Sequence, residues 1–453
     1  MDKIQTSLPK VNSIENDKMD RRQCMENLKK IIDFFNTSNE GTVISLNGKW
    51  GTGKTTFLQM FETHLKNDGY KVLNFNSWEN DDAPDPLIPI MAEFKNLKET
   101  AKSDNSKRNS ETWGKVLNST KIILPSIVGV ASEFISGVNV QSLAESVINA
   151  INEYDNTKSE IKKFKEQLSA YVEEYCKDKP LIFLIDELDR CNPTFAVKTL
   201  ERIKHLFEVP NIVYIIAIDN VQLCHSIRGY YGSEKFDAED YLRRFFKYQY
   251  DLPQSNNPES LVEFALDNFN FASCKFSKRF EERREQLIKF IAMLYEIKQM
   301  SIRQLEQYSL NVCMILSKCE KIDFDPLAIT LMLHVKMFSP HIFEEYTNKR
   351  ISDNEIIKFF RENYVIDPSK VEIGPGLHRI LMYEAVSEML IVRYGPYENI
   401  KSIFYDNENL KLETKGFLED EFEKHFKDRI DSLEPKRVTL DNLLKHLNLS
   451  CKF

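Results

Sequence analysis

The chain has 453 residues, which is enough for two or three packed units. Hydrophobic residues make up 42% of the chain and charged residues 29%, a balance that indicates a globular protein and excludes a disordered one. Lys and Arg number 61 and Asp and Glu 69, so the formal charge is −8. That charge argues against a protein that coats nucleic acid, although it is compatible with local basic patches.

The N-terminal 20 residues are a polar tail without the apolar stretch of a signal peptide. The eight cysteines are scattered, with no C-x-x-C pair and no zinc-like spacing of Cys and His. In a chain of this length they indicate reduced thiols and a cytoplasmic location.

The first functional motif lies in VISLNGKWGTGKTTFLQMF, residues 43–61. An apolar run, a glycine-rich turn and a helix-like pattern follow one another, and the turn matches G-x-x-x-x-G-K-[ST]. Backbone N–H groups of such a loop, at the positive end of a helix, bind a triphosphate. Lys54 is expected to reach the β- and γ-phosphates and Thr55 to ligate Mg²⁺. The residues predicted to bind nucleotide here are Gly48, Trp50, Gly51, Thr52, Gly53, Lys54, Thr55 and Thr56.

A second motif, LIFLIDELDR, occupies residues 181–190. Its five leading apolar residues predict a strand that is buried on both faces of a parallel sheet. Asp186 at its end is expected to hold Mg²⁺, and Glu187 to orient and deprotonate the attacking water. Asp189 is an alternative for either role.

A third strand is predicted in NIVYIIAIDN, residues 211–220. Asp219 or Asn220 would end it at the carboxyl edge of the sheet, where ligands of open α/β sheets bind. A polar side chain there could contact the γ-phosphate or the attacking water. For Asn220, the alternative is the N-cap of a helix that starts at Val221.

Three arginines are further candidates. Arg243 and Arg244 lie on a predicted helix before a short strand, and either could present its charge to the γ-phosphate of a neighbouring subunit. The alternative is a surface helix with salt bridges to nearby carboxylates. Arg303, near the start of another helical segment, could reach the nucleotide from a lid, or it is a surface arginine.

Together these pieces resemble a KAP-family P-loop NTPase, a group related to the STAND and AAA+ NTPases. The matching segments span roughly residues 20 to 320 and are LNGKWGTGKTTFL, VLNFNSWEND, LIFLIDELDRCNP, VKTLERIKHLF, IVYIIAIDNVQL and YLRRFFKYQYDLP. The resemblance implies an ASCE-type parallel sheet in which one strand separates the acidic strand from the phosphate loop. It also implies Mg²⁺ and ATP as ligands and, in bacteria, roles in excluding phages or policing mobile elements.

The chain departs from that family at three places. Members often carry a second aspartate where this chain has Glu187, and a lysine-containing segment where it has Arg243 and Arg244. Many members also insert transmembrane helices between the phosphate loop and the acidic strand.

The interval between Lys54 and Asp186 is long, which predicts an insertion at residues 100–154. Residues 100–112 are expected to form a polar linker, and residues 122–138 a buried or partner-facing helical hairpin. The latter run contains Pro125 and Glu133 and is shorter than the ~20 apolar residues of a bilayer crossing, so it is not expected to span a membrane. In EIKKFKEQLSAYVEEY, one apolar face predicts a helix packed on the core; its residues are Ile161, Phe164, Leu168, Val172 and Tyr175.

The expected organisation is an α/β P-loop core at residues 21–99 and 155–255, a helical lid at 256–322 and a helical sensing or docking domain at 323–453. The C-terminal third contains no nuclease, protease, deaminase or metal motif. We therefore expect a Mg²⁺-dependent regulatory ATPase that forms a homo-oligomer and acts on an effector protein from another chain. The alternatives are a motor stimulated by nucleic acid, for which no basic stripe is visible, and a nucleotide-bound scaffold without turnover.

Overall fold

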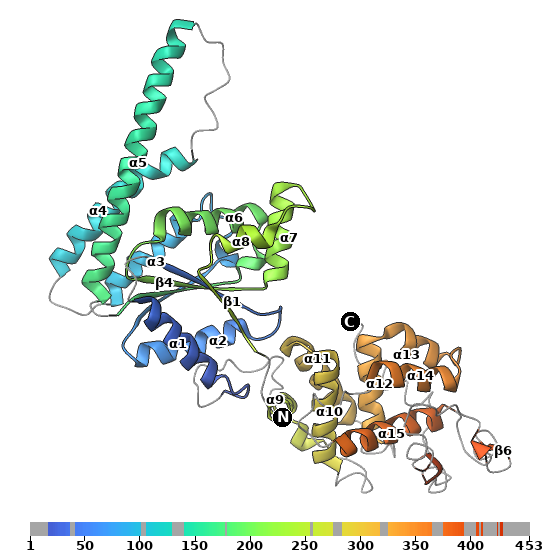
Figure 1. Cartoon of the computed structure of the whole chain (residues 1–453). Helices are drawn as coiled ribbons and strands as arrows, with labels where there is room; N and C mark the ends of the chain where they lie inside the picture. The colour runs from blue at the N-terminus through green and yellow to red at the C-terminus, as the bar shows by residue number, and fades with distance from the viewer. Residues whose placement is uncertain are drawn as a thin grey trace. The chain divides into compact units, whose positions relative to one another are not determined.

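The computed structural model describes residues 17–36, 41–100, 106–128, 140–176, 179–253, 257–274, 283–317, 325–364 and 375–393, together with a few residues between 405 and 428. The chain divides into two compact units, Val11–Gln254 and Ser255–Phe453. The first contains the predicted phosphate loop and acidic strand, and Figure 1 shows its helices on both faces of a sheet.

The sheet of the first unit has five parallel strands in the order β2-β3-β4-β1-β5. Their bounds are β1 (Thr42–Asn47), β2 (Lys71–Asn76), β3 (Leu181–Asp186), β4 (Ile212–Ile218) and β5 (Tyr248–Asp251). Strand β4 pairs with β1 on one side and with β3 on the other. The acidic strand β3 is thus separated from the phosphate-loop strand β1 by one intervening strand, and the expected α/β fold with an ASCE-type sheet is confirmed.

Helices α1 (Arg22–Asn36) and α2 (Lys54–Asn67) supply the helical side chains packed on one face of the sheet. Because side chains alternate along a strand, every second residue of the central strands faces these helices. Ile182 and Leu184 of β3 pack there, beside Val213 and Ile215 of β4. This packing fixes the direction of α2 and therefore the orientation of the loop that precedes it.

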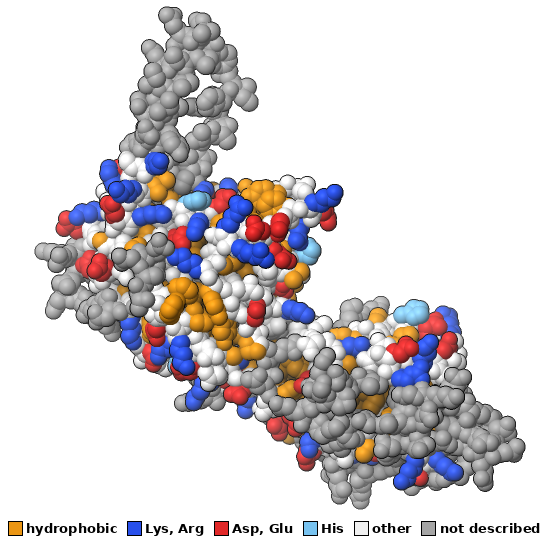
Figure 2. Space-filling model, viewed as in Figure 1, with side chains coloured by type: hydrophobic (Ala, Val, Ile, Leu, Met, Phe, Trp, Pro, Cys, Tyr) orange, Lys and Arg blue, Asp and Glu red, His pale blue; other side chains and the backbone are white. Residues whose placement is uncertain are grey.

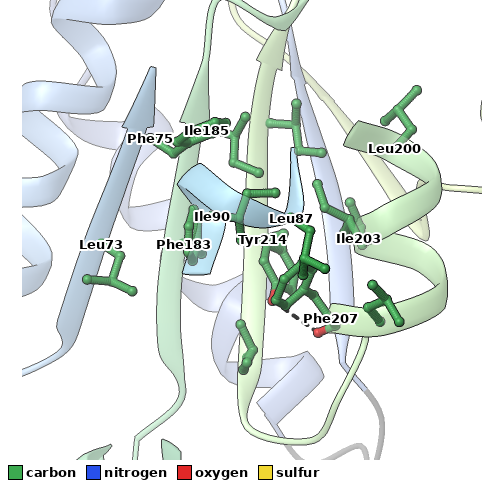
Figure 3. Close-up of a cluster of buried hydrophobic side chains, with 14 of the residues drawn as sticks. Leu73, Phe75, Leu87, Ile90, Phe183, Ile185, Leu200, Ile203, Phe207 and Tyr214 are labelled. Atoms are coloured by element: carbon green, nitrogen blue, oxygen red, sulfur yellow. Dashed lines mark hydrogen bonds between the residues drawn. The ribbon is translucent and has the colours of Figure 1, made fainter. Parts of the chain in front are cut away.

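The intervening strand residues pack on the other face, against α3 (Leu87–Thr100), α6 (Pro193–Arg202) and neighbouring segments. Figure 3 shows Phe183 and Tyr214 from adjacent strands in this cluster, with Phe207 opposite them. The hydroxyl of Tyr214 donates to the Phe207 carbonyl at 3.0 Å, which satisfies a polar atom inside the core. Phe207 ends a π-helical turn, η4 (Ile203–Phe207), that continues α6.

Four further elements of this unit are short or directly follow the end of a strand. They are the 3₁₀ turns η2 (Trp78–Asn80) and η3 (Leu188–Arg190) and the helices α7 (Asn220–Tyr231) and α8 (Ala238–Arg243). Turn η3 follows the acidic strand directly, and α7 follows β4.

The predicted insertion contains two long helices, α4 (Ser106–Val128) and α5 (Val140–Cys176). The prediction of a polar linker at residues 100–112 is wrong for Thr100, which ends α3, and for residues 106–112, which belong to α4; residues 101–105 lie outside the described part. The ring centroid of Trp113, which directly follows the polar segment in α4, lies 5.0 Å from that of Tyr171 on α5. Packing against α5 therefore stabilises the helix at this point of the chain. Helix α5 also passes without interruption through residues 154 and 155, where the sequence placed a boundary.

The apolar face predicted for residues 160–175 is confirmed. Phe164, Leu168, Val172 and Tyr175 of α5 are buried, and Ile161 is partly buried against the same cluster. Of the predicted hairpin at 122–138, residues 129–138 lie outside the described part. None of the described helices has the length and apolar character needed to cross a bilayer.

The second unit is mainly helical, as expected for the C-terminal region. Its helices are α9 (Pro258–Asn268), η5 (Phe271–Ser273), α10 (Arg284–Lys298), α11 (Ile302–Leu316), α12 (Pro326–Phe338), α13 (Pro340–Thr347), α14 (Asp353–Tyr364) and α15 (Pro375–Val392). Helix α12 is buried along almost its whole length. A short antiparallel pair, β6 (Tyr405–Asp406) and β7 (Asn409–Leu410), was not anticipated.

Candidate nucleotide-binding site

The phosphate loop lies between β1 and α2, in the strand–loop–helix order that its sequence predicts. Gly51 and Gly53 have φ angles of 78° and 81°, a left-handed conformation that glycine adopts without strain. A Cβ atom at Gly48 would lie 2.8 Å from Oγ1 of Thr52. That hydroxyl in turn donates to the Lys49 carbonyl at 2.8 Å. The turn therefore leaves no room for a Cβ atom at Gly48 and needs a left-handed backbone at Gly51 and Gly53, which explains the glycines of this loop.

Lys54, the first residue of α2, folds back over the loop. Its Nζ donates to the Gly48 carbonyl at 2.6 Å and lies 3.7 Å from Oδ2 of Asp189. Burial lowers the pKa of the Lys54 ammonium, and the nearby carboxylates of Asp189 and Asp219 partly offset that shift. A phosphate oxygen could replace the Gly48 carbonyl as the acceptor, and the buried ammonium would interact with it more strongly than it would in water.

Thr55 at the start of α2 and Asp186 at the end of β3 lie close together beside the loop. Burial raises the pKa of the Asp186 carboxyl, and hydrogen bonding from the Thr55 side chain and from the Glu187 N–H, the latter at 2.9 Å, opposes the shift. One hydroxyl and one carboxylate are oxygen ligands of the type that Mg²⁺ prefers. Since they lie next to the phosphate loop, they would hold a magnesium ion, which would supply positive charge to a bound triphosphate. Among the described residues there is no group of three or more His, Cys, Asp or Glu side chains that could hold a metal ion.

Glu187 follows Asp186 in a left-handed backbone conformation, with φ 60° and ψ 25°. Non-glycine residues rarely adopt this conformation, and it turns the chain from β3 into η3. The Glu187 carboxylate accepts from Arg190 Nη1 at 2.5 Å and, more weakly, from Asn76 Nδ2 at 3.4 Å. Arg190 also lies over the exposed ring of Trp78, 5.7 Å from its centroid. The predicted catalytic base is thus engaged in an ion pair in this structure.

Asp189 connects three parts of the site. Its Oδ2 accepts from the indole Nε1 of Trp50 at 2.8 Å and from the backbone N–H of Asp219 at 2.6 Å, and it lies 3.7 Å from Lys54 Nζ. Only 4% of the residue is exposed. These contacts connect the phosphate loop to the ends of β3 and β4, and the two roles considered for Asp189 stay predictions.

Asp219 caps the helix that follows β4. Its Oδ1 accepts from the N–H groups of Val221 and Gln222, and its Oδ2 accepts from the N–H of Trp50 at 2.9 Å. The alternative that Asn220 is the N-cap is wrong, because α7 begins at Asn220 itself and Asp219 is the capping residue. The N–H of Asn220 donates to the side chain of Asn47 at 3.0 Å, which ties α7 to the end of β1.

The three candidate arginines are exposed. Arg243 and Arg244, at the end of α8, have side chains 76% and 74% exposed and lie 3.8 and 3.6 Å from the carboxylate of Asp240. Arg303 is exposed in the first turn of α11, in the second unit. All three side chains are accessible to another molecule, and their roles stay predictions.

Residues 21–317 match the P-loop domain of the KAP family, which is more than half of the chain. The chain belongs to the KAP family of P-loop NTPases. This agrees with the phosphate loop, the acidic strand and the intervening strand between them. No curated protein matches the sequence.

Among solved structures, the KAP chain is similar to Cdc6p from Pyrobaculum aerophilum, with 14% identity and a TM-score of 0.34 over 99% of this chain and 86% of that one. It is also similar to a DNA replication initiation factor, with 12% identity and a TM-score of 0.30 over 98% and 99% of the two chains. A Drosophila ORC structure bound to DNA matches with 14% identity and a TM-score of 0.27 over 95% and 85%. These values are too low to bear on function.

Sequence reasoning missed three residues that contact the site. Asn76 and Arg190 reach Glu187, and Arg21 donates to carbonyl oxygens of the phosphate loop. A polar residue at the end of β2 could have indicated Asn76, because the carboxyl ends of parallel strands share one edge. The sequence around Arg21 contains no comparable indication, since its partners lie 31 and 232 residues away.

Proposed function

We propose that this KAP-family protein is a Mg²⁺-dependent regulatory ATPase whose nucleotide state controls its assembly or the activity of a partner protein. The observation that carries the proposal is the convergence of a complete phosphate loop, the Thr55–Asp186 pair and Glu187 on one edge of the sheet. The role in bacterial defence against phages rests on the family alone.

Each residue has a distinct task in this proposal. The loop N–H groups and Lys54 hold the triphosphate, while Thr55 and Asp186 would hold Mg²⁺, which neutralises charge on the β- and γ-phosphates when bound. Glu187 orients the attacking water and accepts its proton once its carboxylate has left Arg190. Asp219 fixes Trp50 and the start of α7, because both of its oxygens accept backbone hydrogen bonds.

The direct test is the native mass of the Glu187→Gln protein with and without Mg²⁺-ATP. This variant is expected to bind ATP and to hydrolyse it ~10²–10⁴-fold more slowly than wild type, since a positioned general base contributes about that factor. Growth to a defined oligomer with ATP supports control of assembly. Lys54→Ala is the matched control, because it should fail both to bind ATP tightly and to assemble. Equal ATP affinity in wild type and Lys54→Ala would contradict the nucleotide site itself.

A second candidate function is a nucleotide-bound scaffold that does not turn over ATP. The 2.5 Å contact between Glu187 and Arg190 favours it, because a carboxylate held in this contact is not free to orient a water molecule. Arg190→Ala should raise turnover if this contact restrains Glu187, whereas Arg22→Ala, at an exposed position on α1, should not. Absence of turnover in wild type and Arg190→Ala alike would favour the scaffold.

The same assay includes DNA and RNA as additives. On the face shown in Figure 2, acidic and basic side chains are interspersed among the described residues. Such a surface offers no extended positive path for a phosphate backbone on that face. Stimulation of turnover by nucleic acid would nevertheless replace the regulatory proposal with a motor.

A further inference from the structure

Arg21 is a buried cation directly beneath the phosphate loop. It precedes α1, and only 1% of the residue is exposed. Its Nη2 donates to the carbonyls of Thr52 at 2.8 Å and Pro253 at 2.9 Å, and its Nη1 lies 3.5 Å from the carbonyl of Gly53. One guanidinium thus contacts two consecutive peptide groups of the loop that is proposed to bind the triphosphate.

These contacts set the direction of the loop N–H groups. A trans peptide is planar, so its N–H points opposite to its C=O. Arg21 holds the Thr52 carbonyl, and the Gly53 carbonyl, which accepts the Phe57 N–H at 2.9 Å, also faces Nη1, so the N–H groups of Gly53 and Lys54 must point away from the guanidinium. A phosphate loop binds its ligand through such N–H groups on its concave side. The guanidinium therefore orients the donors without touching the ligand.

Arg21 is itself anchored at two points, one at its backbone and one at its guanidinium. Asp17 accepts the backbone N–H of Arg21 and that of Met19, the latter at 3.0 Å, and so holds the turn before α1. Pro253 follows Leu252, whose N–H donates to the Asn47 carbonyl at 2.8 Å at the end of β1. Because both anchors belong to the framework around the sheet, the loop is attached to rigid elements through Arg21.

We propose that Arg21 is a positioning residue for triphosphate binding, which holds the Thr52 and Gly53 carbonyls so that the following N–H groups face the phosphates. The inference rests on the proposed nucleotide site and adds to it a residue outside the motif. The planar guanidinium of Arg matters here, because its donors lie on separate nitrogen atoms and can point to different carbonyls. The donors of Lys all lie on one nitrogen and cannot reach the same carbonyls together.

The test compares Arg21→Lys and Arg21→Ala with Arg22→Ala, which removes a cation from the exposed neighbouring position. The dissociation constant of a fluorescent ATP analogue should rise about tenfold in Arg21→Ala and by a smaller factor in Arg21→Lys, and stay at the wild-type value in Arg22→Ala. In turnover, KM should rise while kcat at saturating ATP changes little, since the contact supports binding rather than the chemical step.

Hydrogen exchange of the peptide covering residues 48–54 supplies a readout in nucleotide-free protein. The amide hydrogens of this peptide should exchange faster in Arg21→Lys than in Arg22→Ala, because the loop carbonyls lose their contacts with the Arg21 guanidinium. If Arg21→Ala does not fold, the ATP affinity and the hydrogen exchange of Arg21→Lys decide whether the inference holds. Wild-type affinity and wild-type exchange in a folded Arg21→Lys would overturn the inference. Failure of the wild type to bind ATP would instead refute the proposed function, and the exchange comparison would still test Arg21.

Discussion

Replacing Asp189 by alanine tests whether this carboxylate is structural. Its Oδ2 accepts hydrogen bonds from the Trp50 indole and the Asp219 backbone, at 2.8 and 2.6 Å. The Asp189→Ala variant keeps the glycine-rich loop, Lys54 and Glu187. The substitution removes the connection between the phosphate loop and the ends of β3 and β4. It leaves in place the residues predicted to bind the nucleotide and to activate water.

The expected loss follows from the exposure of each donor. A hydrogen bond to a charged group contributes about 1.5–3 kcal/mol, and a buried donor left without an acceptor costs a similar amount. Trp50 is 46% exposed, so water can replace Asp189 at its indole N–H, whereas Asp219 is 6% exposed and its N–H cannot be solvated as easily. The Asp219 bond therefore dominates, and we expect the free energy of unfolding to fall by about 2–4 kcal/mol.

Thermal unfolding of the nucleotide-free protein measures this loss. The transition of the first unit is the one that Mg²⁺-ATP raises in the wild type, since a ligand stabilises the state that binds it. For a unit of this size, 2–4 kcal/mol corresponds to a decrease in Tm of about 4–16 °C. Asp189→Asn is the matched control, because it keeps an oxygen acceptor and should lose less. Asp189→Ala with a Tm within 2 °C of Asp189→Asn would refute the structural assignment.

Two further predictions concern the loop and the exposed arginines. Gly48→Ala should weaken ATP binding, because its Cβ would lie 2.8 Å from Thr52 Oγ1, whereas Gly114→Ala, with nothing within 4 Å, should leave affinity unchanged; titration of both variants with a fluorescent ATP analogue decides. Arg243→Ala or Arg244→Ala should slow steady-state ATP hydrolysis without weakening binding, because an arginine supplied in trans stabilises charge in the transition state. Wild-type rates in both variants, measured at a concentration where the wild type is assembled, would make them surface residues.

Local pattern was sufficient to predict the central elements. The strand before the phosphate loop and the acidic strand are largely apolar runs ended by polar residues, and β1 and β3 cover those runs. The apolar spacing from Ile161 to Tyr175 likewise predicted the buried face of α5. These features follow from periodicity within one segment, so no information about distant residues was required.

The insertion shows where such reasoning fails. Residues 106–112 are polar and were predicted to be a linker, yet they form the first two turns of α4. Thr112 Oγ1 donates to Glu174 at 2.7 Å and Trp113 packs against Tyr171, both on α5. A partner helix some 60 residues away stabilises a helix that its own composition does not favour, since tertiary packing overrides local propensity.

The sequence by itself determined the family, the phosphate loop and the identity of Lys54, Thr55 and Asp186 as candidate ligands, because each lies at a fixed offset within a continuous motif. Only the tertiary structure decided that Asp189 connects the loop to the neighbouring strands and that Arg21 supports it from below. Their partners lie 30 to 232 residues away along the chain. Such contacts depend on how the sheet brings strand ends together, and no local spacing encodes them.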